Sequence, residues 1–144
     1  MGVLTGKVAV VTGSGRRKGL GEAIVKRLAG DGAAVVISDI GQSADAATPD
    51  DMIGATDEMN AIAQDIRDAG GTASLKTCDV RNWKSVHALA DHAVSEHGAL
   101  DIWVNNAGIG YIMKPLLEVT EDEWRSEERR VGNGCRFRWA PVPS

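Results

Sequence analysis

The feature that most constrains the fold is the stretch from residue 8 to residue 24, VAVVTGSGRRKGLGEAI. Its first residues are apolar without alternation, which is typical of a strand covered on both faces in a parallel sheet. A glycine-rich turn follows, and then Leu20, Ile24 and Leu28 recur at helical spacing. Glycines there let the backbone approach a phosphate closely, and the N–H groups of a helix N-terminus attract an anion. The stretch predicts a nucleotide-phosphate loop, with a purely structural αβ turn as the alternative.

A second apolar strand is predicted at residues 33–39, AAVVISD, and it ends in the carboxylate of Asp39. In a dinucleotide fold, an acidic residue about 20 positions after the glycines hydrogen-bonds the adenosine ribose hydroxyls. Asp39 lies 18 residues after Gly21. The alternative is a solvated Asp at the end of a strand.

The strand-then-helix pattern continues to residue 108. A helix from Asp57 ends at a glycine pair, a strand is predicted at residues 73–78, and a further helix leads to a strand at residues 100–104. This pattern predicts an α/β fold with a Rossmann-type doubly wound parallel sheet, strand order 3-2-1-4 and right-handed crossovers. Ligands of such sheets bind beyond the carboxyl ends of the strands.

Composition limits the class of protein. The chain has 144 residues, with 43% hydrophobic and 25% charged residues, which suits one globular domain. Its net charge of −4 gives no support for nucleic-acid binding. We find no signal-peptide pattern and no apolar run of membrane-spanning length, so we expect a cytoplasmic location and no membrane partner.

Cysteines and histidines give no sign of a metal site. The two cysteines, Cys78 and Cys135, form no disulfide or metal pattern, which fits a reducing compartment, and Cys78 is predicted to be a small core residue. His87, His92 and His97 are five residues apart. This spacing places successive histidines well apart around a helix, so we expect no bound metal.

With these motifs placed, residues 3–124 resemble the short-chain dehydrogenase/reductase family. The resemblance rests on the opening LTGKVAVVTG and on four motifs in the family's order: the glycine motif Thr12, Gly13, Gly19 and Gly21; Asp39; the pair Asp79-Val80; and the box Asn105 to Gly108. It implies an NAD(P)-dependent oxidoreductase that interconverts an alcohol and a ketone by hydride transfer. It also implies that the intact protein is a homo-oligomer.

The resemblance further implies which residues contact the cofactor. The expected contacts are Gly13, Gly19, Leu20 and Gly21 to the pyrophosphate, Asp39 and Ile40 to the adenosine ribose, Asp79 and Val80 to the adenine, and Asn106, Ala107 and Gly108 to the nicotinamide-side ribose. Asn105 is expected to tie neighbouring strands together rather than to contact the ligand.

The glycine loop departs from the family pattern. Five residues, 14–18, separate Gly13 from Gly19, two more than usual, and three of them are the cations Arg16, Arg17 and Lys18. We expect these cations near the cofactor phosphates, including the 2′-phosphate of NADP, because guanidinium suits phosphate. Asp39 would repel that 2′-phosphate, so NAD is the preferred cofactor and NADP the alternative. A solvated loop tip would also explain the cations.

No catalytic residues are expected in this chain. The family's catalytic Ser and Tyr-x-x-x-Lys come after the point where the resemblance ends. The single tyrosine, Tyr111, precedes Lys114 by three residues rather than four. We therefore interpret the chain as a truncated cofactor-binding half, inactive by itself and of marginal stability, because its fourth strand would be an exposed apolar edge. The alternatives are a nucleotide-binding module without turnover and a nucleotide-fold methyltransferase.

The tail, residues 125–144, differs in kind from the rest. It carries 5 Lys/Arg against 2 Asp/Glu, whereas residues 1–124 carry 11 against 18. Its first eight residues, RSEERRVG, can be encoded by AGATCGGAAGAGCGTCGTGTAGGG, which resembles a widely used sequencing adaptor. We therefore predict that the native domain covers residues 1–124 and that the tail is translated adaptor read-through. The alternative is a genuine divergent or frameshifted tail.

Overall fold

The computed structural model describes residues 2–41, 55–108, 118 and 120. The chain divides into two units, Met1–Gly110 and Tyr111–Ser144, and the fold described below belongs to the first. Its elements are β1 (Val8–Thr12), α1 (Leu20–Gly30), β2 (Ala34–Ser38), α2 (Thr56–Asp68), β3 (Thr72–Leu75), α3 (Trp83–His97) and β4 (Ile102–Val104).

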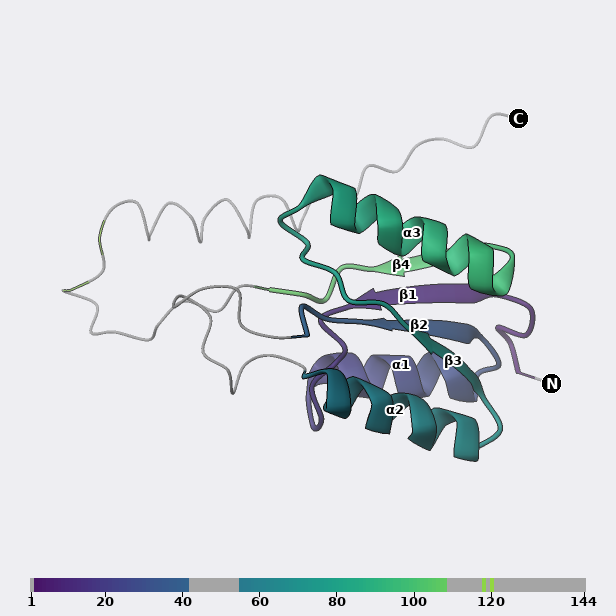
Figure 1. Ribbon diagram of the computed structural model, residues 1–144. Helices are drawn as coiled ribbons and strands as arrows, with labels where there is room; N and C mark the ends of the chain where they lie inside the picture. Colours follow the sequence, from purple (N-terminus) through teal and green to yellow (C-terminus); the bar gives the residue numbers. More distant parts are fainter. Residues whose placement is uncertain (1, 42–54, 109–117, 119, 121–144) are drawn as a thin grey trace. The chain divides into compact units, whose positions relative to one another are not determined.

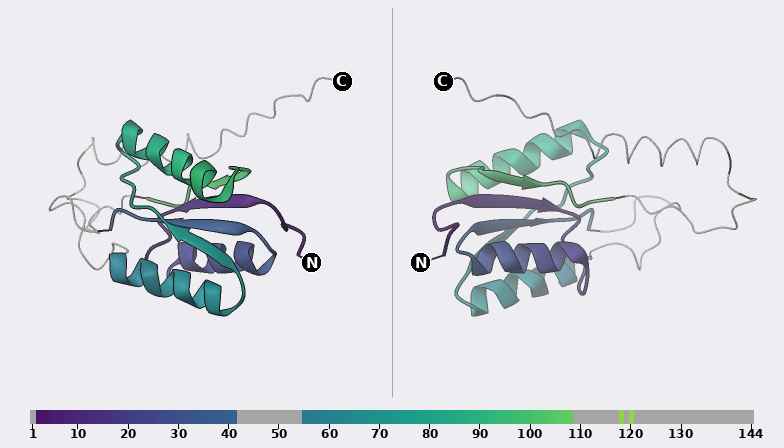
Figure 2. Two further views of the ribbon diagram at one scale, coloured as in Figure 1. Left: turned by 45° about the vertical axis from the view of Figure 1, so that its right-hand side comes forward. Right: turned by 180° about the vertical axis from the view of Figure 1, so that it is seen from behind.

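The four strands form one parallel sheet in the order β3-β2-β1-β4, which confirms the predicted order. Val10 in β1 pairs with Val36 in β2 on one side and with Trp103 in β4 on the other. Helices α1 and α2 cover one face of the sheet and α3 covers the other (Figures 1 and 2). Because all strands run the same way, their carboxyl ends meet at one edge, to which Figure 1 shows the arrowheads pointing.

The alternation of side chains along the strands divides the core between the two faces. In β1, Ala9 and Val11 pack with the buried side chains of α1 and α2, whereas Val8 and Val10 pack with Leu89 and other residues of α3. All five β1 residues are buried. The uninterrupted apolar run that predicted a central strand therefore reflects a strand with a helix layer on each side.

Helix ends follow from local chemistry. The Asn82 side chain accepts hydrogen bonds from the N–H groups of Lys84 and Ser85 and so caps α3, which ends at Gly98 with φ 83°. Helix α1 begins after Gly19, whose lack of a side chain leaves no such cap among the described residues. The N-terminus of α3 is therefore capped by a side chain, whereas the N-terminus of α1 has no side-chain cap among the described residues.

Three predicted strands are shorter in the structure. The strand expected at residues 33–39 is Ala34–Ser38. The strand expected at residues 73–78 is Thr72–Leu75, and the strand expected at residues 100–104 is Ile102–Val104. Beyond β3 the chain still follows β2, since Lys76 N–H donates to Ile37 O at 3.1 Å and Cys78 N–H to Asp39 O at 2.9 Å. Among the described helices, none is long and apolar enough to cross a membrane.

Candidate dinucleotide site

The turn after β1 is fastened to the end of β2. Ser14 is fully buried, its hydroxyl donates to Val11 O at 2.7 Å, and its N–H donates to Ser38 O at 2.9 Å. Gly13 has φ 64°, and a Cβ placed there would lie 2.6 Å from Ala107 Cα. Only glycine fits at this joint between β1 and the segment after β4.

The N-terminus of α1 approaches the same turn. A Cβ on Gly21 would lie 2.6 Å from Ser14 Cα and would also overlap the Gly13 carbonyl oxygen, so the first turn of the helix rests against the loop backbone. Since no side chain caps this helix among the described residues, its first N–H groups are suited to an external anion. Gly19 and Gly21, which were predicted to contact the pyrophosphate, lie at this N-terminus.

Asp39 follows β2 and holds the loop from the other side. Its Oδ2 accepts the Gly15 N–H at 3.0 Å and its Oδ1 accepts the Ile40 N–H at 2.9 Å. A Cβ on Gly15 would lie 2.6 Å from Asp39 Cβ, so the loop passes directly over this carboxylate. Each carboxylate oxygen retains a lone pair for a hydroxyl donor.

Asp79, which follows β3, is paired with Arg81. The guanidinium forms a fork with the carboxylate, with Arg81 Nε 2.9 Å from Asp79 Oδ1 and Nη2 2.8 Å from Oδ2. The Arg81 N–H also donates to Oδ1 at 2.9 Å. These bonds hold the pKa of Asp79 below its ordinary value, because they stabilise the ionised form.

The two asparagines after β4 do not divide the roles as predicted. Asn106 ties the strands together, since its Nδ2 donates to Thr12 O at 3.0 Å and to Gly13 O at 2.9 Å. Asn105 is exposed, and its Oδ1 accepts the indole N–H of Trp103 in its own strand. The prediction that Asn105 joins neighbouring strands is therefore wrong, because the bend after β4 turns Asn106 and not Asn105 toward β1.

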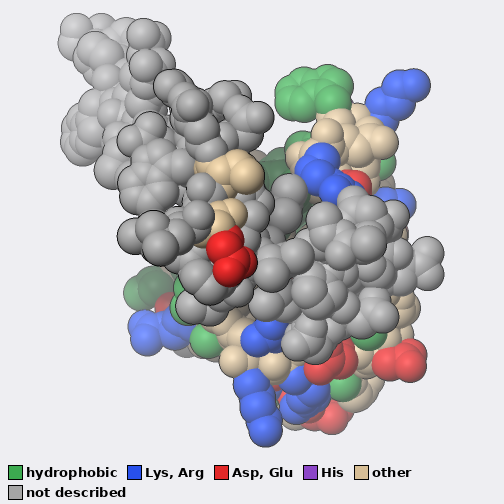
Figure 3. Space-filling model, turned by 90° about the vertical axis from the view of Figure 1, so that its left-hand side faces the viewer, with side chains coloured by type: hydrophobic (Ala, Val, Ile, Leu, Met, Phe, Trp, Pro, Cys, Tyr) green, Lys and Arg blue, Asp and Glu red, His purple; other side chains and the backbone are tan. Residues whose placement is uncertain are grey.

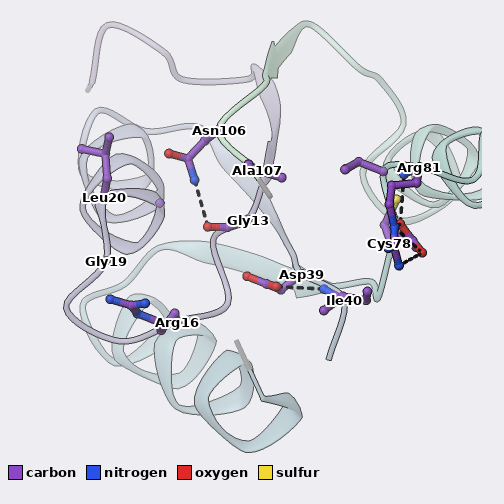
Figure 4. Close-up of a pocket in the computed structure, with 14 residues that line it drawn as sticks. Gly13, Arg16, Gly19, Leu20, Asp39, Ile40, Cys78, Arg81, Asn106 and Ala107 are labelled. Atoms are coloured by element: carbon purple, nitrogen blue, oxygen red, sulfur yellow. Dashed lines mark hydrogen bonds and ion pairs between the residues drawn. The ribbon is translucent and has the colours of Figure 1, made fainter. Parts of the chain in front are cut away.

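One pocket at the carboxyl edge of the sheet brings together all the residues predicted to contact the cofactor. The predicted residues that line it are Gly13, Arg16, Gly19, Leu20, Gly21, Asp39, Ile40, Asp79, Val80, Asn106, Ala107 and Gly108. Two further residues line it that the sequence reasoning missed, Cys78 and Arg81. Figure 4 shows Asn106 and Ala107 on one side of Gly13 and Asp39 and Ile40 on the other. Cys78 is also buried, as predicted.

Of the three loop cations, only Arg16 lines the pocket. Arg17 instead pairs with Asp65 of α2, with Nη2 3.0 Å from Oδ2. The expectation that all three cations lie near the cofactor phosphates is therefore wrong for Arg17, because an acidic partner on α2 binds it. In the view of Figure 3, the visible described residues include Lys/Arg and Asp/Glu side chains close to one another.

The histidines of α3 also differ from expectation. His97 Nε2 lies 2.8 Å and His92 Nε2 3.2 Å from the hydroxyl oxygen of Ser74 in β3, so these two side chains converge although they are five residues apart. Burial, reinforced by the nearby His92, lowers the pKa of His97. In the part of the chain that the structure describes, no three His, Cys, Asp or Glu side chains are grouped to hold a metal ion.

Several sequence predictions lie outside the described residues. Tyr111, Lys114 and the whole of the tail, residues 125–144, are among them. The assignment of the tail as adaptor read-through and the boundary at residue 124 accordingly stay predictions.

The three-layered fold and the pocket at its strand ends define a Rossmann-type α/β protein. Over residues 7–129 the chain matches the family described as short chain dehydrogenase. The chain belongs to this family, the short-chain dehydrogenases/reductases. The resemblance was predicted to end at Trp124, and the family match extends five residues further, to residue 129.

Individual relatives agree with this assignment. The cis-4-hydroxycyclohexanecarboxylate dehydrogenase of Sinomonas cyclohexanicum is 40% identical over 119 residues, which cover 83% of this chain and 41% of the relative. The carveol dehydrogenase of Mycobacterium avium, solved in complex with NAD, superposes with a TM-score of 0.71 at 28% identity, over 87% of this chain and 44% of that one. A metagenomic short-chain oxidoreductase in complex with NADP superposes with a TM-score of 0.62 at 35% identity, over 84% and 48%. The chain thus spans less than half the length of these proteins.

Proposed function

We propose that this chain contains the dinucleotide-binding half of an NAD(P)-dependent short-chain oxidoreductase that interconverts an alcohol and a ketone. The observation that carries the proposal is the single pocket shared by the glycine turn, the carboxylate of Asp39 and the Asn106–Gly108 segment. In such an enzyme the bound nicotinamide supplies the hydride acceptor or donor. The residues described here would hold the cofactor.

The pocket suits the parts of a dinucleotide in order. The open N-terminus of α1 at Gly19 and Gly21 would hold the pyrophosphate, as a helix terminus without its own cap attracts an anion. Asp39 would accept hydrogen bonds from the hydroxyls of the adenosine ribose. Asp79 and Arg81 would lie beside the adenine. Ala107, whose small side chain lines the opposite wall, leaves room beside the second ribose.

NAD is proposed as the preferred cofactor. A 2′-phosphate on the adenosine ribose would lie against the Asp39 carboxylate, and the two negative charges would repel each other. Arg16 lines the same pocket and would attract that phosphate. We propose that Asp39 decides the preference, because the N–H groups of Gly15 and Ile40 hold its carboxylate in place at the pocket.

For the chain as it stands, we propose cofactor binding without turnover. The catalytic Ser and Tyr-x-x-x-Lys of the family have no counterpart in the sequence. The substrate of the full-length protein is proposed only as a small carbonyl or alcohol compound. A cytoplasmic location and a homo-oligomeric full-length form belong to the same proposal.

Calorimetric titration of the 144-residue chain tests this function. We expect NAD to bind about tenfold more tightly than NADP, a difference of roughly 1.4 kcal/mol. S-adenosylmethionine should not compete with NAD, which separates this site from that of a methyltransferase. A parallel assay should show no ketone-dependent oxidation of NADH. Tighter binding of S-adenosylmethionine than of NAD would overturn the proposal, and ketone reduction would overturn the claim of no turnover.

A further inference from the structure

Lys18, directly before the N-cap of α1, has an unusual backbone conformation. Its φ of 60° lies in the left-handed region, where a residue with a side chain is strained. The Lys18 N–H donates to the carboxylate of Glu22, which is one turn into the helix. Glu22 therefore supports the loop at the point where the backbone is least favourable.

The position of this hydrogen bond matters for the phosphate site. Glu22 is the third helical residue after the N-cap Gly19, and in a capping box the side chain there accepts the N–H of the N-cap residue itself. Here it accepts the N–H one residue earlier. A single carboxylate therefore bonds the loop one residue before the N-cap rather than at the Gly19 N–H.

Glu22 is in turn held by a cluster of charges. It is only 8% exposed, and its Oε1 lies 2.7 Å from Lys26 Nζ. Lys26 Nζ also lies 2.9 Å from Asp65 Oδ2, the oxygen that pairs with Arg17. Burial of the Glu22 carboxyl opposes ionisation, but the hydrogen bonds from Lys26 and Lys18 outweigh it and keep the pKa of Glu22 below its ordinary value.

These contacts close around the two-residue extension of the loop. Arg17 is fastened to α2 through Asp65, and Lys18 is fastened to α1 through Glu22, while Lys26 joins the two acids. Without these partners, three consecutive cations would repel one another and the longer loop would sample many conformations. The partly exposed Arg17–Asp65 pair contributes little alone, so the nearly buried Glu22 carries most of the effect.

We propose that Glu22 is a positioning residue of the dinucleotide site, which holds the extended glycine loop over the pocket, with Asp65 as its second anchor. This inference rests on the proposed function, because the loop is taken to cradle a dinucleotide pyrophosphate. It assigns the role to residues that do not line the pocket and that the sequence analysis did not single out.

Trypsin tests whether Glu22 and Asp65 hold the loop, and it needs no cofactor, since Arg16, Arg17 and Lys18 are three successive cleavage sites. Mass spectrometry of the 144-residue chain should show loop cleavage at least about fivefold faster in Glu22→Ala than in the wild type. Glu22→Gln retains an oxygen that can accept the Lys18 N–H, so it should restore most of the protection. Arg27→Ala, which removes an exposed ion pair on the same helix, should leave loop cleavage unchanged.

NAD titration of the same proteins tests whether these contacts of Glu22 and Asp65 affect the dinucleotide site. Kd for NAD should rise about tenfold in Glu22→Ala and about threefold in Asp65→Ala, whereas Asp68→Ala, one turn along α2, should not change it. Circular dichroism checks folding, and if Glu22→Ala does not fold, Asp65→Ala carries the test. Wild-type cleavage and wild-type Kd in Glu22→Ala, or a wild-type Kd in Asp65→Ala where Glu22→Ala does not fold, would overturn the inference. Failure of the wild type to bind NAD would instead overturn the proposed function, and the cleavage result would stand.

Discussion

The two sides of the pocket differ in how their polar groups are held. The amide half, which we define as Gly13 with residues 106–108, is bonded across strands: Asn106 donates to two carbonyls at the end of β1, and the Thr12 hydroxyl accepts the N–H groups of Asn106 and Ala107. The acidic half, defined as Asp39, Ile40 and residues 79–81, lies at the ends of β2 and β3.

In the acidic half most of the bonds are local. Asp39 accepts the N–H of the adjacent Ile40 and also that of Gly15 in the glycine loop, and Asp79 is bound by Arg81 two residues away. A change in the amide half should therefore disturb the sheet, whereas a change in the acidic half should alter the choice of ligand and leave the fold in place. The predictions below test this division, beginning with the largest effect.

Gly13→Ala should give the largest loss of stability. The substitution forces a side chain into a left-handed conformation and places its Cβ 2.6 Å from the Ala107 backbone, so either β1 or the segment after β4 must move. We expect a loss of about 3 kcal/mol in the free energy of unfolding, measured with urea.

Gly30→Ala is the matched control. It lies at the last residue of α1, and a Cβ there meets no described atom within 4 Å. Since Ala is the better helix former, this variant should be neutral or stabilised by up to about 1 kcal/mol. Equal effects of the two substitutions would contradict the account of the joint at Gly13.

Asn106→Asp should destabilise the protein nearly as much. The shape is preserved, but a carboxylate oxygen replaces the Nδ2 that donates to Thr12 O and Gly13 O, so it faces two carbonyls. We expect a loss of about 2 kcal/mol at pH 7 in the same unfolding assay, since buried acceptors lose their donor.

Asn105→Asp tests the same chemistry one residue earlier. Asn105 is exposed and already acts as an acceptor for the Trp103 indole, so a carboxylate serves equally well. Its stability should change by less than about 0.5 kcal/mol. If this variant were the more damaging of the two, the strand-tying role would return to Asn105.

The amide half also shows what the sequence could and could not predict. The order of strands and helices follows from apolar runs and glycines within the chain, whereas the set of pocket residues was implied by the resemblance to the family. The roles of Asn105 and Asn106 depend on the direction of one bend, which adjacent identical residues do not reveal. Arg81 was missed because its guanidinium folds back on Asp79, and the Asp-x-Arg spacing was the only available signal.

The histidines and the loop teach the same lesson. His92 and His97 converge because Ser74 lies beneath α3, and a helical wheel contains no information about the neighbouring strand. Arg17 was predicted to lie near the cofactor because of its position in the loop, but it pairs with Asp65, which lies 48 residues later in the chain. Predictions failed where a long-range partner decides the direction of a side chain.

In the acidic half, Asp39→Asn should change ligand choice. The amide keeps one of the two oxygen acceptors that bind the Gly15 and Ile40 N–H groups and removes the charge that opposes a 2′-phosphate, while Arg16 remains in the pocket. Titration calorimetry should show the ratio of Kd for NADP to Kd for NAD falling about tenfold.

Asp79→Asn provides the control for Asp39→Asn. It removes the same charge from the same half of the pocket, but at the proposed adenine end, where NAD and NADP are identical. Affinity for both cofactors should fall together and the ratio should stay constant. A change in the ratio for Asp79→Asn, or none for Asp39→Asn, would break the assignment of the ribose position to Asp39.

Arg81→Ala should have the smallest effect, and it is most visible through pH. Arg81 lowers the pKa of Asp79, so the stabilisation from this carboxylate is complete above the ordinary carboxyl pKa and is lost as the pH falls through the lowered value. Without Arg81 the pKa of Asp79 should rise toward its ordinary value, so this stabilisation should shrink and stability should fall less steeply on acidification. At pH 7, NAD binding should weaken only about threefold, roughly 0.7 kcal/mol. Lys84→Ala removes a nearby positive charge whose side chain has no described bond to Asp79, so its acid limb should match the wild type. If Arg81→Ala and the wild type lost the same free energy of unfolding on acidification, the ion pair with Arg81 would not control the protonation of Asp79.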